Sequence, residues 1–187
     1  MLADLTWPKT TERLVLRMAG DDDVEPLWQI RRKPEVSRWM THASTDWDDF
    51  RTRAQAPEWR AVTVVVERDG VLIGDLMLKV EDAWGQGEVA DQVVGVQAEI
   101  GWCLDPSASG QGYATEAVVE LVRIGFRELG LRRLTALCFA ANEPSWRLME
   151  RIGMRREAHN VADSLHRSGE WMDGYSYALL EQEWSPA

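Results

Sequence analysis

The segment best suited to carry chemistry is a glycine loop that runs directly into a helical pattern. Gly110 and Gly112 stand between an apolar strand pattern ending at Leu104 and a helical pattern beginning at Tyr113. The first N–H groups of a helix have no acceptor within it, and with the helix dipole they attract an anion. Because glycine has no Cβ, a phosphate can approach those N–H groups closely. The pattern favours a phosphate-binding loop, although a tight turn into the helix would use the same glycines.

Two well-known nucleotide-binding loops do not fit this segment. A Walker loop requires Lys and then Ser or Thr after its last glycine, whereas Tyr113 and Ala114 follow here. A dinucleotide fingerprint requires a third glycine near Thr115 and an acidic residue at the end of the next strand. The segment after Leu131 contains no acidic residue before Glu143. The loop is therefore expected to bind a different kind of phosphate ligand.

Three other polar side chains are further candidates. Asn142 and Ser145 are three residues apart at the start of a second helical pattern, so they share a face near its N-terminus. Helix capping by Asn142, with Pro144 in the first turn, would explain the same residues. Glu99 lies in the strand pattern that leads into the loop, where a carboxylate is either a general base or the partner of a neighbouring arginine.

An alternation of strands and helices in one α/β domain, residues 1–187, must position these groups. The patterns predict strands over residues 12–18, 61–67, 71–80, 93–104, 131–139, 161–166 and 171–180, and helices over 22–32, 47–56, 113–129 and 142–152. Asp69-Gly70 between two β-rich runs predicts a hairpin. Pro34 is expected to stop the first helix, and Gly130 and Gly153 to close the last two.

Composition excludes several classes of protein. The chain has 31 acidic and 21 basic residues, a formal charge of −10, which argues against direct nucleic-acid binding. It contains neither an apolar run of about 20 residues nor a signal-peptide pattern, so a cytoplasmic protein without membrane contact is expected. Cys103 and Cys138 lie in apolar runs without a CxxC motif, which indicates buried, reduced thiols and no metal site. His42, His159 and His166 are expected at solvated positions.

Several separate motifs, in the right order, resemble those of the GNAT superfamily of acyl-CoA-dependent N-acetyltransferases. They are Gly110-Gln111-Gly112-Tyr113-Ala114-Thr115-Glu116-Ala117, Asn142-Glu143-Pro144-Ser145 and Leu148-Met149-Glu150-Arg151-Ile152-Gly153-Met154. The RimJ/RimL branch, which acetylates ribosomal-protein N-termini, is resembled by Thr11-Glu12-Arg13-Leu14-Val15-Leu16-Arg17 and by Gly169-Glu170-Trp171-Met172-Asp173 with Glu183-Trp184. The resemblance implies a single GNAT domain, with a mixed, mostly antiparallel sheet flanked by helices.

The resemblance also implies acetyl-CoA as the acyl donor and assigns the residues that bind it. The loop would hold the pyrophosphate through its backbone, from Ser109, Gly110, Gln111 and Gly112 to Tyr113, Ala114 and Thr115. Ser109 departs from the Gln or Arg that often begins the family loop, but backbone N–H groups do most of the binding, so it should survive, at most weakened. The pantetheine arm would bond to the backbone of Trp102, Cys103 and Leu104 and to Asn142. Ser145 would lie near the sulfur as the acid, and Glu99 resembles the strand acid that serves as base.

The acceptor is expected to be a primary amine, either a ribosomal-protein N-terminus or a small cationic amine. An α-amine of pKa near 8 requires only about 1 kcal/mol to deprotonate at pH 7, against roughly 4 to 5 kcal/mol for a lysine. A modest base such as Glu99, acting through water, would suffice. Two alternatives stay open: a non-catalytic acyl-CoA-binding module, and a transferase that uses a larger donor such as succinyl-CoA. A monomer and a homodimer are both compatible with the sequence.

Overall fold

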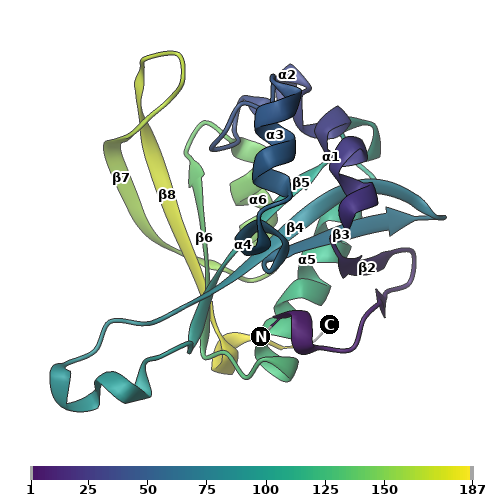
Figure 1. Ribbon diagram of the computed structural model, residues 1–187. Coiled ribbons are helices and arrows are strands. Elements are labelled where there is room, and N and C mark those ends of the chain that lie inside the picture. The colour runs from purple at the N-terminus through teal and green to yellow at the C-terminus, as the bar shows by residue number, and fades with distance from the viewer. Residues whose placement is uncertain (1, 186–187) are drawn as a thin grey trace. The chain divides into compact units, whose positions relative to one another are not determined.

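In the computed structural model, which describes residues 2–185, eight strands follow the hydrogen-bonded order β1-β2-β3-β4-β5-β6-β8-β7 (Figure 1). They are β1 Lys9–Thr10, β2 Val15–Met18, β3 Thr63–Arg68, β4 Val71–Glu81, β5 Gln97–Leu104, β6 Arg133–Phe139, β7 Arg155–Leu165 and β8 Trp171–Leu180. β5 and β6 pair in parallel, whereas β1–β2, β2–β3, β3–β4, β6–β8 and β7–β8 are antiparallel. The predicted mixed, mostly antiparallel sheet is confirmed.

The α-helices are α1 Val24–Arg31, α2 Pro34–Ser37, α3 Trp47–Ala54, α4 Pro57–Arg60, α5 Tyr113–Arg123 and α6 Glu143–Arg151. A π-helical turn, Ile124–Glu128, continues α5. Short 3-10 turns are η1 Leu2–Asp4, η2 Asp21–Asp23, η3 Gly87–Gln92, η4 Pro106–Ala108 and η6 Glu181–Glu183. Within the described residues, no helix is long and apolar enough to cross a membrane.

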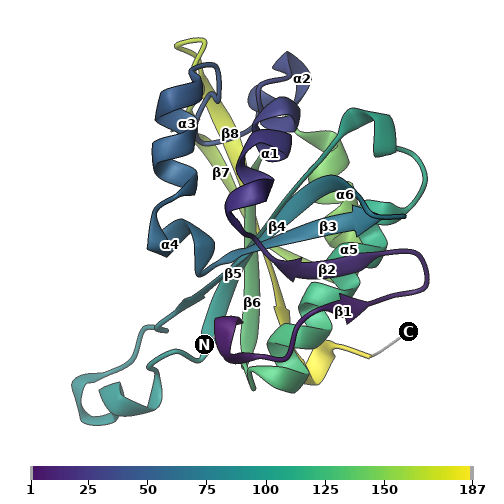
Figure 2. The same cartoon turned by 45° about the vertical axis from the view of Figure 1, so that its right-hand side comes forward.

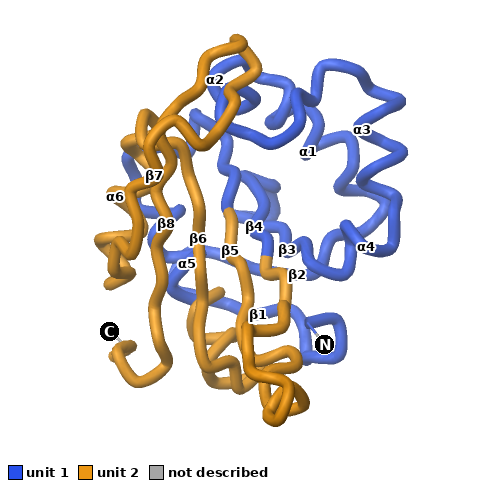
Figure 3. Tube along the Cα trace, turned by 90° about the vertical axis from the view of Figure 1, so that its left-hand side faces the viewer, with its two compact units in different colours: residues 1–77, 102–120 blue, residues 78–101, 121–187 orange. Residues whose placement is uncertain are grey.

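The chain forms two compact units (Figure 3). The first consists of the residues up to Met77 together with Trp102–Glu120, and the second of Leu78–Gly101 together with the residues from Leu121 onward. β4, β5 and α5 each run from one unit into the other. The glycine loop belongs to the first unit, whereas Glu99, Asn142 and Ser145 belong to the second.

In the first unit, helices α1 and α3 lie side by side over one face of β3 (Figure 2). The buried cluster beneath them consists of Val24, Leu27, Phe50, Ala54 and Val65. The rings of Trp28 and Trp47 meet edge to face at 5.2 Å, joining α1 to α3. Val64 and Val66 point away from this cluster, because side chains alternate along a strand, and both are fully buried. Both faces of β3 are therefore covered.

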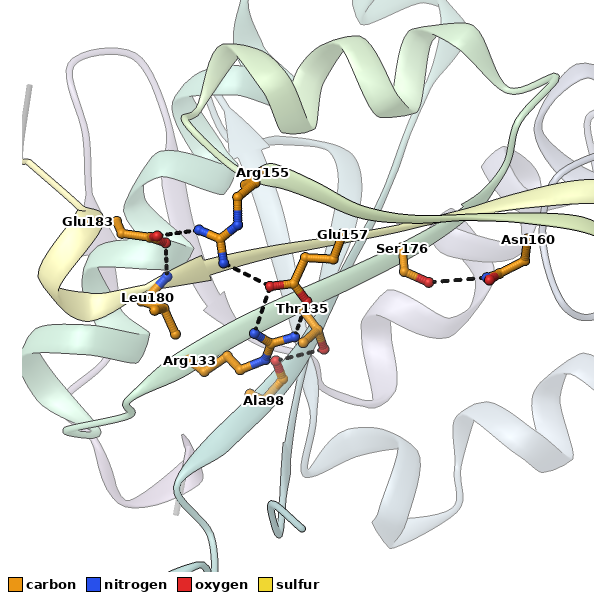
Figure 4. A network of polar contacts seen from close by, with 9 residues as sticks. All are labelled: Ala98, Arg133, Thr135, Arg155, Glu157, Asn160, Ser176, Leu180 and Glu183. Atoms are coloured by element: carbon orange, nitrogen blue, oxygen red, sulfur yellow. Dashed lines mark hydrogen bonds and ion pairs between the residues drawn. The ribbon is translucent and has the colours of Figure 1, made fainter.

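In the second unit, an ion network holds the ends of β6, β7 and β8 together (Figure 4). Glu157 of β7 accepts from Arg133 of β6 at 3.0 Å and from Arg155 at 2.8 Å. Arg155 also pairs with Glu183, whose other oxygen accepts from the backbone N–H of Leu180 at 3.0 Å. These contacts connect the three strands through side chains that hydrophobic patterning does not reveal.

The predicted elements are present, with shifted bounds. The hairpin is confirmed, since Asp69 and Gly70 have φ of 51° and 76°, as a two-residue turn with left-handed residues requires. β5 begins at Gln97 rather than 93, because Gly95 forms a turn with φ of 63°. β7 begins at Arg155 rather than 161, since most of its residues are exposed and therefore carry little periodic signal. Pro34 begins the short helix α2 after α1 has ended at Arg31.

The two cysteines are free, as predicted. Cys103 is buried and Cys138 half-buried. Burial raises the pKa of the Cys103 thiol to about 12 and that of Cys138 to about 11. Both side chains therefore remain protonated near neutral pH and have little nucleophilic character.

A buried ion pair connects α1 to β4 in the first unit. Arg31 Nε donates to Asp75 Oδ1 at 3.0 Å, and its Nη2 pairs with Oδ2. The Asp75 side chain is 2% exposed and that of Arg31 15%. Burial acts to lower the pKa of Arg31, but the Asp75 carboxylate more than offsets this, so the pKa is raised. Each charge therefore depends on the other for compensation away from water.

We predict that Asp75→Asn destabilises the protein by about 3 to 5 kcal/mol, because it leaves a buried guanidinium without its counter-charge. Replacing both partners, Arg31→Met with Asp75→Leu, should cost less than the single change. Urea unfolding of the three proteins measures this. Asp48→Asn is the control, because its pair with Arg51 is exposed and should contribute less than about 1 kcal/mol. A loss in Asp75→Asn as small as in the control would contradict the prediction.

Candidate active site

The glycine loop presents its backbone to solvent at the start of an eleven-residue helix. Ser109, Gly110, Gln111 and Gly112 are all exposed, and Tyr113 begins α5. Gly110 and Gly112 have φ of 74° and 83°, in the region that favours glycine. A Cβ at position 110 would meet no atom within 4 Å. The glycines therefore serve the backbone conformation and leave the start of α5 open to a ligand.

The strand end that leads into the loop is held firmly in the first unit. Trp102 and Leu104 are half-buried and Cys103 is buried. A Cβ at position 74 would lie 2.4 Å from the carbonyl oxygen of Cys103, so only glycine fits there. The backbone N–H of Asp105 donates to Ile73 O at 2.8 Å. The direction in which the chain leaves β5 is therefore fixed by backbone contacts.

The Asp105 side chain then fixes the turn that follows β5. It accepts from the backbone N–H of Ser107 at 2.9 Å and from Lys33 Nζ at 2.7 and 2.8 Å. Burial acts to raise the pKa of Asp105, but these partners outweigh it and the pKa is lowered. An ionised carboxylate therefore holds η4, and with it the entry to the glycine loop.

Side chains around the loop anchor it to the first unit. The Tyr113 ring is buried, with the guanidinium groups of Arg13 and Arg68 at 4.7 and 4.9 Å from its centroid. Ala114 and Thr115 are half-buried in the first turn of α5. Arg13 also donates to the backbone carbonyl of Gln111 at 3.0 Å. The buried Tyr113 ring therefore packs within the first unit and fixes the end of the loop.

Glu99 is half-buried in the second unit, near the carboxylate of Glu81. It is opposite Thr135 in the parallel β5–β6 pair. Burial raises the pKa of Glu99, the nearby Glu81 carboxylate raises it further, and Lys79 opposes both. Lys79 itself pairs with Glu81 at 2.7 Å. Within the described residues, no arginine is among the groups that shift the pKa of Glu99, so the alternative of an Arg–Glu sheet pair finds no support.

Asn142 and Ser145 stand at the start of α6, as their spacing predicts. Asn142 occupies the N-cap position, but its side chain makes no capping hydrogen bond. Ser145, in the first turn with Pro144, donates its backbone N–H to Asn142 O at 3.1 Å. Capping therefore does not use the Asn142 amide, which leaves that side chain to other partners.

One histidine differs from the expectation, and one cluster has no signal in the sequence. His166 is buried, with its ring against Phe139 at 5.5 Å, whereas His42 and His159 are exposed as predicted.

The cluster without a signal in the sequence lies on β7 and β8. In it, Arg156 donates to the buried Tyr177 hydroxyl at 2.8 Å, and its guanidinium lies 4.1 Å from the centroid of the Tyr175 ring. Alternation on β8 places both tyrosines on one face, but no local pattern predicts the arginine from β7.

These groups offer an anion-binding loop and acid–base chemistry. The first unit brings the strand end and the glycine loop together. The second holds a carboxylate of raised pKa and the amide and hydroxyl at the start of α6. Among the described residues, no group of three or more His, Cys, Asp or Glu side chains could hold a metal ion.

Residues 13–155, most of the chain, match the family model of the acetyltransferase (GNAT) domain. The chain belongs to the GNAT family of acetyltransferases. It is therefore an acyltransferase enzyme, and the reaction general to its family is acetyl transfer from acetyl-CoA to an amine. The family and the fold that the motifs predict are both confirmed.

Individual GNAT relatives agree with this assignment. The chain is 29% identical to the uncharacterized N-acetyltransferase YnaD of Bacillus subtilis over 179 residues, which cover 94% of this chain and 98% of YnaD. A GNAT acetyltransferase structure from Bacillus anthracis is 31% identical with a TM-score of 0.78, over 95% of this chain and 100% of that one. The structure of RimL, a ribosomal L7/L12 alpha-N-protein acetyltransferase in complex with coenzyme A, has a TM-score of 0.76 at 20% identity, over 91% of this chain and 95% of that one. This last similarity shows the fold.

We predict that Gly110→Ala weakens coenzyme A binding at least about fivefold, because alanine disfavours the left-handed backbone and the loop shifts. Gly130→Ala is a matched control, since Gly130 also has a positive φ, of 65°, and open space around a Cβ. Both variants should lose about 1 to 2 kcal/mol of unfolding free energy. Calorimetric titration with coenzyme A measures the affinity of each variant, which should be reduced in Gly110→Ala alone. Equal affinities in the two variants would show that the loop does not bind the ligand.

Proposed function

We propose that this GNAT enzyme transfers acetyl from acetyl-CoA to a primary amine of a cationic acceptor, with a protein N-terminal α-amine as the first candidate. A small cationic amine is the second. The observation that carries the proposal is Glu99, a half-buried carboxylate whose pKa is raised and whose neighbour is a second carboxylate. The motifs of the RimJ/RimL type at both ends of the chain support the N-terminal acceptor.

In this proposal the donor is bound mainly through backbone. The segment from Ser109 to Thr115, exposed as far as Gly112, holds the pyrophosphate, because its glycines and the start of α5 offer N–H groups and a positive dipole end. The backbone from Trp102 to Leu104 and the Asn142 amide bind the pantetheine arm. The Asn142 side chain suits that role because it makes no capping hydrogen bond.

Glu99 acts as the general base. The amine attacks the thioester carbonyl carbon in its neutral form, and the nitrogen must release one more proton as the N–C bond forms. Glu99 accepts that proton, and a carboxylate of raised pKa is a better acceptor than an ordinary one. Because an α-amine has a pKa near 8, only about 1 kcal/mol is required to obtain its neutral form at pH 7. A carboxylate acting through one water molecule is sufficient for that acceptor.

Charge favours a cationic acceptor. No lysine or arginine occurs between Lys79 and Arg123, and the first part of that stretch carries Glu81, Asp82, Glu88 and Asp91. An acidic surface raises the encounter rate with a cation.

The last step of the proposed reaction releases coenzyme A. After attack, the C–S bond breaks and the thiolate leaves. In this scheme the Ser145 hydroxyl donates a proton to the thiolate and regains one from solvent, although a thiol of pKa near 8.5 leaves readily without help.

A ligand and acceptor panel tests the proposal. The unfolding temperature should rise by about 5–11 °C with acetyl-CoA or CoA at about 100 times Kd, and not with NADH or ATP. Release of free thiol should then be followed with peptides that have a free α-amine and a Lys/Arg-rich body, with matched Glu-rich peptides, and with spermidine. We expect the basic peptides to react fastest. N-terminally blocked peptides are the control.

Other outcomes would change the assignment. Faster turnover with succinyl-CoA than with acetyl-CoA would indicate the larger acyl donor. Binding of CoA without turnover of any amine would favour an acyl-CoA-binding module. A faster reaction with spermidine than with every peptide would make the small cationic amine the acceptor.

We predict that Glu99→Gln lowers kcat/KM for the peptide amine by about 10² or more. In the wild type, log kcat/KM should rise with slope 2 at low pH, because the amine and Glu99 must both lose a proton. The slope should change to 1 above the raised pKa of Glu99. In Glu99→Gln the slope should be 1 throughout the acid limb. A pH–rate profile from about pH 4.5 to 9 measures both.

Glu81→Gln is the informative control for this profile. Removing the neighbouring carboxylate removes one cause of the raised pKa of Glu99, so the change of slope should move to lower pH while activity near pH 8 is retained. If Glu99→Gln keeps full activity and the slope-2 limb, another group is the base.

A further inference from the structure

The opening motif Thr11-Glu12-Arg13 makes contacts that the proposed function has not used. Glu116, in the first turn of α5, accepts from Thr11 Oγ1 at 2.5 Å and from the backbone N–H of Arg13 at 2.9 Å. The Arg13 guanidinium also pairs with it, through Nε and Nη2, each at 2.7 Å. Four donors from one short segment therefore converge on one carboxylate, and all of these residues lie within the first unit.

The position of this carboxylate creates an electrostatic problem. A negative side chain in the first turn of a helix is favourable by itself, because it faces the positive end of the dipole. However, the same end of α5 is proposed to bind a pyrophosphate, and a carboxylate there repels a second anion. The Glu116 side chain is only 16% exposed, so solvent screens this repulsion incompletely.

Arg13 is positioned to remove that repulsion. Its guanidinium neutralises the Glu116 carboxylate and at the same time donates to Gln111 O at 3.0 Å, inside the loop. Burial acts to raise the pKa of Glu116, but the hydrogen bonds from Thr11 and Arg13 outweigh it and the pKa is lowered. The carboxylate therefore stays ionised at neutral pH, and a permanent counter-charge is required.

We infer that Arg13 is a positioning residue for coenzyme A: it cancels the charge of Glu116 and fixes the loop at Gln111, so that the start of α5 accepts a pyrophosphate. This inference rests on the proposed role of the loop. The role proposed for Arg13 differs from a purely structural one, because the affinity for coenzyme A then depends on the net charge of the Arg13–Glu116 pair.

The test is a double-mutant cycle measured by calorimetric titration with coenzyme A. Arg13→Gln, which keeps hydrogen-bond donors but no charge, should weaken binding about tenfold at about 0.1 M salt. Glu116→Gln should bind as tightly as the wild type or up to a few-fold more tightly. The double variant, Arg13→Gln with Glu116→Gln, should recover to within about threefold of the wild type, although it lacks the ion pair.

Two comparisons separate the local charge effect from others. Arg51→Gln is the matched control: Arg51 also pairs with a carboxylate in the first turn of a helix of the same unit, Asp48 of α3. This variant should change affinity less than about threefold. The loss in Arg13→Gln should also shrink at about 1 M salt, where the Debye length is only about 3 Å against about 10 Å at 0.1 M.

The outcomes distinguish the inference from the proposed function. If the wild type does not bind coenzyme A, the proposed function fails first. If the wild type binds and Arg13→Gln binds equally well, the inference alone is wrong. A double variant weaker than either single variant, or a loss that salt does not change, would show that the pair only holds the structure.

Discussion

The close approach of β4 to the end of β5 is the constraint on which the loop depends. A Cβ at position 74 would lie 2.4 Å from Cys103 O and 2.7 Å from Leu104 Cα, so the two backbones meet where no side chain fits. Beyond this contact, Asp105 is fixed by Ile73 O and by Lys33. The chain therefore leaves the strand in one direction, and this direction sets where the glycine loop and the start of α5 lie. A binding site made of backbone N–H groups requires such support, because those groups have no side-chain freedom with which to adjust.

Much of the fold follows from local signals in the sequence. Asp69-Gly70 predicts the hairpin because few residues tolerate two successive positive φ angles, and Gly130 and Gly153, both at positive φ, end helical patterns for a similar reason. β7 is predicted only in part, because most of its side chains are exposed and the strand is held by pairing with β8 and by the ion network around Glu157. Hydrophobic periodicity reports burial, so a strand that buries little is hard to detect.

The features of the candidate site also fall into two groups, those with a local signal in the sequence and those without one. Glycines before one helix and Asn142 before another are local features, and spacing alone predicts them. The Arg13–Glu116 pair joins residues 103 positions apart, and the raised pKa of Glu99 depends on burial in the fold and on a carboxylate from another strand. Nothing in the sequence around His166 indicates that its ring packs against the Phe139 ring in the fold. These features depend on contacts between distant parts of the chain, which only the tertiary structure supplies.

The charge of the protein shows why such contacts matter more than composition. A chain with a net charge of −10 is an unexpected host for an anionic donor such as acetyl-CoA. Salt at physiological strength screens exposed charges beyond about 8 Å, so a bound phosphate responds mainly to the groups nearest to it. At the start of α5, where we propose that the pyrophosphate binds, those groups are backbone N–H donors and a carboxylate already paired with Arg13. Around Glu99, by contrast, the second carboxylate of Glu81 is balanced by Lys79, so the three side chains together keep one negative charge when Glu99 is ionised, which suits a cation. One acidic chain can therefore favour an anion at one set of residues and a cation at another, because each set determines its own local potential.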